Sequence, residues 1–253
     1  MTATPDFVLS TAEFDLLQDS LGLGRAPFPL DVPSQGATME ERAGLAAQAL
    51  NGLAARGLAV RDELDERLGA LLRLLFEHDI SVDAVGHLDQ PLRALAAADR
   101  GLGVLAEVTG DEVRLTEIRP TALARSIVDV LPPNDPGPVR SLSMPSEPLT
   151  RAVEAEDDED DPFGGDLDDH TALTRAGLPS QDAATLIELV ENRRAGGQFG
   201  VTHGSARAST LVNWFDTHQG RYLMTSENSW LSITPADNQR IEHRLASVVS
   251  TVS

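Results

Sequence analysis

The chain has 253 residues, and its 40 acidic and 20 basic side chains give a formal net charge of −20. A charge of this sign repels phosphate backbones and anionic membrane surfaces, which disfavours nucleic-acid binding. The absence of cysteine excludes disulfides and thiolate metal sites, and neither an export signal nor an apolar run of membrane-spanning length is recognisable, so we expect a cytoplasmic protein without membrane insertion.

The first part of the chain is predicted to be mainly helical. After a short strand at 7–10, TAEFDLLQDS predicts a helix with Ser10 or Thr11 as N-cap and Glu13 in its first turn. A second helix follows from the capping pattern of Thr38 to Glu41, and a third is predicted over RDELDERLGALLRLLFEH. Their leucines recur at helical spacing, which predicts amphipathic helices packed close to one another.

From Gln90 the pattern changes to near-alternation. The stretches LRALAAAD, GVLAEVT and EVRLTEI predict two or three antiparallel strands, with a hairpin turn at 109–111. The strands lead into RPTALARSIVDVLPP, where Pro120 occupies the first turn of a helix that Pro132 and Pro133 end.

Residues 132–170 differ from both flanks in composition. They begin proline-rich, and the run 154–169 carries ten acidic and no basic side chains. Such a composition predicts a partly disordered linker between an N-terminal subdomain at 1–131 and a C-terminal subdomain at 171–253. The acidic run is either a spacer or a contact for a basic partner surface.

The C-terminal part repeats the order of strands and helix. AATLIELVENRRAGG predicts a helix that ends at Gly196 and Gly197, and QFGVTHG, STLVNWFDT, RYLMTSE and SWLSIT predict successive strands. The last helix, TPADNQRIEHRLASVV, is predicted to have Thr234 as N-cap and Pro235 at its first position. Each half therefore runs from antiparallel strands into a proline-led helix, which fits an internal duplication and two ordinary α+β units equally well.

Few residues suggest catalysis, metal binding or ligand binding. Trp214, Tyr222 and Trp230 fall on three adjacent predicted strands, where large rings favour packing over a stacking platform for a ligand. The six histidines form no metal-ligand motif, and no nucleophile elbow is present. We therefore expect no catalytic site and no cofactor.

Several stretches, taken in order and spacing, carry a resemblance to a known family. They are LSTAEFDLLQDSLGLGRAPFPLDVPSQGATMEERA, GVLAEVTGDEVRLTEIRPTALARSIVDVLPP, RRAGGQFGV, NWFDTHQGRYL and the tryptophan strand before TPAD. Together they resemble the EspG family, cytosolic chaperones of ESX (type VII) secretion in mycobacteria and related actinobacteria. The resemblance implies an α/β fold of the α+β type, with a central, mostly antiparallel sheet, flanking helical bundles and a pseudo-two-fold internal duplication. It also implies that the protein is not an enzyme.

The resemblance further implies a partner. EspG-like proteins bind the PPE chain of a PE/PPE heterodimer at the tip of its helical hairpin and keep that tip soluble before secretion. The family directs attention to the loop Ala98–Gly103, here with Asp99, Arg100, Gly101 and Leu102. Further candidate contacts are Phe199, Val201, Arg240 and His243. Turn residues such as Asp99 and Arg100 are often simply solvated, so their partner role is a hypothesis.

Other expectations stay open beside this one. Components of the ESX machinery are further candidate partners, and homodimerisation of the free protein is undecided. An alternative from another functional class is a small-molecule-binding or enzymatic α/β protein with a site under the C-terminal strands.

Overall fold

The computed structural model describes residues 4–61, 63–145, 169–175 and 177–252. The chain divides into two compact units. Unit 1 comprises Met1–Pro132, Phe199–Ser209 and Glu242–Ser253, and unit 2 comprises Pro133–Gln198 and Thr210–Ile241. The first boundary lies beside the predicted linker, whereas 199–209 and 242–253, which the sequence suggests are C-terminal, group with unit 1.

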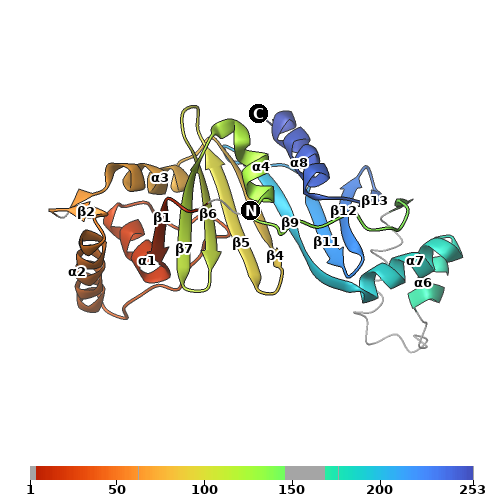
Figure 1. Ribbon diagram of the computed structural model, residues 1–253, viewed down its shortest axis with the longest axis horizontal. Coiled ribbons are helices and arrows are strands. Elements are labelled where there is room, and N and C mark those ends of the chain that lie inside the picture. Colours follow the sequence, from red (N-terminus) through yellow and green to blue (C-terminus); the bar gives the residue numbers. More distant parts are fainter. Residues whose placement is uncertain (1–3, 62, 146–168, 176, 253) are drawn as a thin grey trace. The chain divides into compact units, whose positions relative to one another are not determined.

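Unit 1 is built on an antiparallel sheet (Figure 1). Its central meander consists of β4 (Ile80–His87), β5 (Pro91–Ala98), β6 (Gly103–Thr109) and β7 (Glu112–Ile118). At one edge β1 (Phe7–Ser10) pairs with β7, and β4 neighbours β9 (Arg193–His203), whose residues from Phe199 belong to this unit. The short β10 (Ala206–Arg207) folds back on β9. The hairpin predicted at 109–111 is confirmed, with Gly110 at a φ of +59°.

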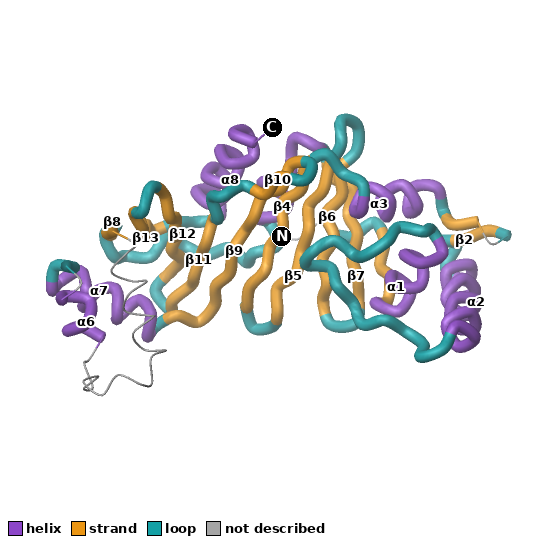
Figure 2. The backbone as a smooth tube through the Cα atoms, turned by 180° about the vertical axis from the view of Figure 1, so that it is seen from behind, coloured by secondary structure: helices purple, strands orange, loops and turns teal. Residues whose placement is uncertain are grey.

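Three helices lie on the β7 side of this meander (Figure 2). They are α1 (Thr11–Ser20), α2 (Met39–Ala55) and α3 (Glu66–Phe76). The predicted capping box is confirmed, because the Ser10 N–H donates to Glu13 Oε2 at 2.8 Å and the Glu13 N–H donates to Ser10 Oγ at 3.1 Å. The third helix starts later than predicted, since β2 (Ala59–Val60) and β3 (Glu63–Leu64) form a small hairpin before it.

The core of unit 1 lies between α3 and the sheet. It includes Leu68, Leu71, Leu72 and Leu75 of α3 and Leu95, Val104, Ala106 and Leu115 of the strands. After β7, a 3₁₀ turn, η1 (Pro120–Ala122), leads into α4 (Leu123–Val128), so the proline-led helix is confirmed, although it ends before Pro132. Burying these leucines is the main stabilising contribution in the unit.

Unit 2 has its own group of antiparallel strands. Its strands are β11 (Val212–Thr217), β12 (Gly220–Glu227), β13 (Trp230–Pro235) and β8 (Leu142–Pro145), in that order, and β11 neighbours β9. Two helices, α6 (Asp169–Arg175) and α7 (Ser180–Glu191), contact each other. β8 arises within the predicted linker, while most of the acidic run, 154–168, lies outside the described residues.

Two predicted helix ends in this part are wrong. Helix α7 ends at Glu191, and Gly196 and Gly197 are strand residues of β9 rather than a helix cap. Helix α8 (Asn238–Val252) starts after the predicted N-cap, because Asp237 Oδ1 accepts the Arg240 N–H at 2.8 Å and Pro235 is the last residue of β13. A capping carboxylate next to the first helical turn satisfies a donor that Thr234 cannot reach from the strand.

The two halves of the chain share one order of elements. Each begins with an edge strand, β1 or β8, continues through helices into the sheet strands β4 to β7 or β9, β11, β12 and β13, and ends in a helix, α4 or α8; the short strands β2, β3 and β10 are additional. In both halves the edge strand returns to pair antiparallel with the last strand of its meander, β7 or β13. The predicted α+β fold with a mostly antiparallel sheet is thereby confirmed, and the repeated order of elements agrees with the expected internal duplication.

Candidate functional site

The loop between β5 and β6 is held in shape by Asp99. Its Oδ1 accepts hydrogen bonds from the N–H groups of Gly101 and Leu102, both at 2.8 Å, and the Asp99 N–H donates to the Leu102 carbonyl at 3.0 Å. The bonds from Gly101 and then Leu102 favour the carboxylate and lower the pKa of Asp99 below its ordinary value. The loop is therefore a closed turn organised by one ionised side chain.

The other loop residues differ in exposure. Arg100 and Gly101 are exposed at the tip, whereas Leu102 is half-buried and packs against the core of unit 1. Asp99 is exposed as well, but its carboxylate is bonded within the turn, and Arg100 is a second charged group that the loop presents to solvent. An exposed arginine on a fixed turn is available to a partner, and it is equally compatible with a solvated turn residue.

A second hairpin meets the root of this loop. The Asp79 N–H donates to the Ala98 carbonyl at 3.1 Å, and the Gly204 N–H donates to the Asp79 carbonyl at 2.8 Å. Gly204 lies in the turn between β9 and β10, more than a hundred residues along the chain from Ala98. No local pattern could have revealed this neighbour, because the link consists of backbone groups that every residue type carries.

The remaining candidate residues are placed differently. Phe199 and Val201 are fully buried in β9, so in this structure they fill space inside unit 1 and offer no surface to a partner. Arg240 and His243 are exposed on α8, and Arg240 Nη1 donates to the Pro235 carbonyl at 2.9 Å. The structure brings Asp99, Arg100, Gly101 and Leu102 together as one exposed turn.

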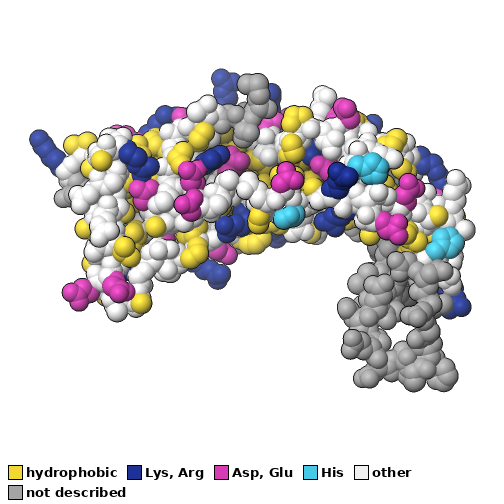
Figure 3. Space-filling view, turned by 60° about the horizontal axis from the view of Figure 1, so that its bottom comes forward, with side chains coloured by type: hydrophobic (Ala, Val, Ile, Leu, Met, Phe, Trp, Pro, Cys, Tyr) yellow, Lys and Arg dark blue, Asp and Glu magenta, His cyan; other side chains and the backbone are white. Residues whose placement is uncertain are grey.

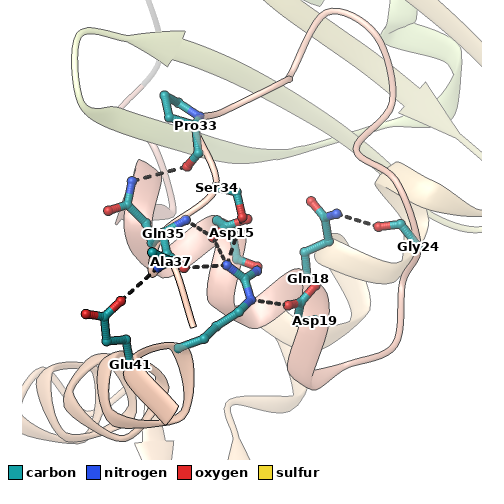
Figure 4. A network of polar contacts seen from close by, with 10 residues as sticks. Asp15, Gln18, Asp19, Gly24, Pro33, Ser34, Gln35, Ala37 and Glu41 are labelled. Carbon is teal, nitrogen blue, oxygen red and sulfur yellow. Dashed lines mark hydrogen bonds and ion pairs between the residues drawn. The ribbon is translucent and has the colours of Figure 1, made fainter. Parts of the chain in front are cut away.

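A polar concavity of about 420 Å³ lies elsewhere in unit 1, between α1 and the start of α2. It contains the guanidinium of Arg42, which donates to Asp15 Oδ2 at 2.8 Å, to Asp19, and to Ser34 Oγ at 2.9 Å (Figure 4). The bonds to Asp15 and Asp19 raise the pKa of Arg42. Because internal carboxylates already neutralise this cation, Arg42 fastens the connection between the two helices, and no anion is needed there.

On the face shown in Figure 3, acidic, basic and hydrophobic side chains are interspersed. Among the described residues, no group of three or more His, Asp or Glu side chains is arranged to hold a metal ion. Within the same residues, no helix has the length and apolar character needed to cross a membrane.

The chain is similar to known proteins both in sequence and in fold. The model of the EspG family matches residues 10–247. Among solved structures, the chain is similar to that of the Mycobacterium tuberculosis type VII secretion system chaperone EspG5 in complex with a PE25-PPE41 dimer. The TM-score is 0.72 at 18% identity, over 98% of this chain and 96% of the other. At this sequence identity the similarity supports a shared fold. The search of curated proteins found no match to the sequence.

Proposed function

The chain belongs to the EspG family, and on this premise we propose that it is a type VII secretion chaperone that binds the PPE chain of a PE/PPE heterodimer. The observation that carries the proposal is the family match over residues 10–247. Its fold is also that of EspG5, which was solved with a PE25-PPE41 dimer. The chaperone would keep the apolar helical tip of the PPE chain soluble and direct the pair to its ESX system.

The binding mode follows from the physics of helix tips. A helical tip carries apolar side chains that lose water when they enter a complementary surface, and a few such anchors supply most of the affinity. The turn Asp99–Leu102 supplies a rim to such a surface, with Arg100 exposed and Leu102 tied to the core of unit 1. In this proposal the charge of Arg100 selects the partner, while the packing of Leu102 against the core fixes the position of the turn.

The proposal extends to activity and location. The family is one of chaperones, which supports a role that involves no catalysis and no cofactor, carried out in the cytoplasm before secretion. The family match does not favour the alternative of a small-molecule site under the C-terminal strands. Components of the ESX machinery remain candidate second partners.

The direct test is co-expression with the PE-like and PPE-like pair encoded nearest to the gene, followed by size-exclusion chromatography with light scattering. We expect a soluble complex with one copy of each chain, and the same measurement on the free protein reports whether it dimerises. A soluble pair that never associates with the chaperone would contradict the proposed function for that pair.

Variants then test the loop. Arg100→Ala should weaken binding by about tenfold through loss of one interfacial contact, and Leu102→Ala by about tenfold because the turn is no longer fixed to the core of unit 1. Arg125→Ala is a matched control, because Arg125 is an exposed arginine of the same unit, paired with Asp129 at 3.6 Å on α4. Equal affinity for all three variants and the wild type would remove the loop from the binding surface. Deleting 154–168 without loss of binding would identify the acidic run as a spacer.

A further inference from the structure

An ion pair fastens β10 to the middle of the sheet. Arg207 Nη1 donates to Asp83 Oδ2 at 2.7 Å, and Arg207 Nη2 donates to Asp83 Oδ1 at 2.9 Å. Asp83 lies on β4 and is only 2% exposed. A two-bonded arginine–carboxylate pair fixes orientation as well as distance, so the guanidinium has one position relative to β4.

A glycine makes room for this pair. A Cβ atom on Gly200 would lie 2.0 Å from Arg207 Nη2 and 3.0 Å from Asp83 Oδ2. The arginine therefore crosses the backbone of β9 at a residue without a side chain. We call Gly200, Arg207 and Asp83 together the clip.

The clip sets the position of the hairpin tip. β10 is held against β9 by the pairing of Ala206 with His203 and by the Ala208 N–H, which donates to the Val201 carbonyl at 2.8 Å. The chain reverses at Gly204, whose φ of +56° suits glycine. In this position the Gly204 N–H reaches the Asp79 carbonyl.

Asp79 connects the hairpin tip to the loop between β5 and β6. Its N–H donates to the carbonyl of Ala98, the residue that directly precedes the turn Asp99–Leu102. The clip, the hairpin tip and the root of the loop are thus joined by consecutive hydrogen bonds, all within unit 1. Loss of the ion pair removes the side-chain restraint on β10, so the position of Gly204 then depends on the backbone pairing of β10 with β9.

We propose that Arg207 is a positioning residue for the β5–β6 loop, and that it acts through Asp83 and the β9–β10 hairpin rather than by touching the partner. The identity of the partner rests on the proposed function. The restraint itself is a property of the free protein, so the two can fail separately.

The first test is amide hydrogen exchange, followed by mass spectrometry or NMR, on the free wild type, Arg207→Ala, Asp83→Asn and the double variant. Arg207→Ala and Asp83→Asn should each speed exchange at Gly204, Asp79 and Leu102 by about tenfold, because local opening costs less without the clip. The double variant should show no further increase, since both changes remove the same interaction. Arg114→Ala is the control: Arg114 is 44% exposed, Arg207 is 43% exposed, and Arg114 pairs with Glu112 on β7.

Binding to the PE/PPE pair is the second readout. Asp83 is buried and cannot touch a partner, so weaker binding by Asp83→Asn as well as by Arg207→Ala supports positioning. Weaker binding by Arg207→Ala alone would mean direct contact and overturn the proposal. Unchanged exchange at Leu102 in both single variants would also overturn it. If the wild type bound no pair, the proposed function would fail, and the exchange experiment would still decide whether the clip positions the loop.

Discussion

Arg221 and Asp216 face each other across two strands of unit 2 and form a buried, two-bonded ion pair. Arg221 Nε donates to Asp216 Oδ1 at 2.7 Å, and Arg221 Nη2 donates to Oδ2 at 2.8 Å. The same guanidinium donates to Asn238 Oδ1 at the start of α8 and lies 5.0 Å from the ring centroid of Trp214. A face of the Trp214 ring is therefore taken by an internal cation, which supports packing rather than ligand stacking.

This pair predicts a large stability effect. Arg221→Met should lower the free energy of unfolding by about 3–5 kcal/mol, because Asp216 is left as a buried charge without its cation. Urea unfolding followed by tryptophan fluorescence measures the loss. Arg140→Ala serves as the control, since the Arg140 side chain is 65% exposed in its pair with Asp182 and should cost only about 0–1 kcal/mol. Similar losses for the two variants would contradict the assignment.

Two glycines should respond to alanine in opposite directions. A Cβ on Gly137 would lie 2.0 Å from Tyr222 Cζ, and the Tyr222 hydroxyl, which accepts the Val139 N–H at 3.3 Å, holds that ring in place. Gly137→Ala should therefore destabilise by about 1–3 kcal/mol through overpacking. Gly44 on α2 has nothing within 4 Å of an added Cβ, so Gly44→Ala should stabilise by about 0.5–1 kcal/mol. Thermal unfolding of both variants would check the signs.

Glu107 predicts a dependence on pH. Burial of this half-buried side chain on β6 raises its pKa above the ordinary 4.5, and the charge of Arg114 offsets only part of that. The folded state therefore holds the proton more tightly than the unfolded state, and this stabilisation is present below pH 4.5 and lost as the pH rises through the folded pKa. Glu107→Gln does not titrate, so its stability relative to the wild type should increase from acid to neutral pH. A difference that stays constant with pH in denaturant titrations would refute this.

The pKa of Asp99 is shifted in the opposite direction from that of Glu107, so its effect on pH dependence has the opposite sign. The hydrogen bonds from Gly101 and Leu102 lower its pKa below 3.8, so the order that the carboxylate gives the turn is present above that value and lost as the pH falls through the folded pKa. Asp99→Ala should speed amide exchange at Gly101 and Leu102. Asp99→Asn should have a smaller effect, because an amide oxygen still accepts both bonds. Exchange in Asp99→Ala as slow as in the wild type would show that the backbone alone holds the turn.

Local chemistry explains what could be predicted from the sequence. The capping box of Ser10 and Glu13 and the turn at Gly110 depend on residues a few positions apart, and both are found as expected. Strand β4 was missed, because Asp83 stands at a core position and interrupts the apolar pattern. Its cation, Arg207, lies 124 residues away, and no spacing along the chain signals such a pair.

Contacts between residues far apart in the sequence also limit what could be predicted of the candidate site. The turn Asp99–Leu102 was located correctly as the connection between two strands, because the alternation stops there. The burial of Phe199 and Val201 depends on neighbours that the sequence does not place beside them. The β9–β10 hairpin as a support for the turn is also absent from the predictions, since its contact is made by backbone atoms of Gly204 and Asp79.

The separation of Asp83 and Arg207 has a consequence for synthesis of the protein. At roughly 5–20 residues per second, the ribosome needs about 6–25 s to add the 124 residues that separate them. During that interval β4 is made without β9 beside it, and Asp83 lacks the arginine that pairs with it in the folded protein. The strands of unit 1 that come from the second half of the chain are therefore missing when β4 is first made. Until β9 is synthesised, the edge of β4 that will pair with it is open to other chains.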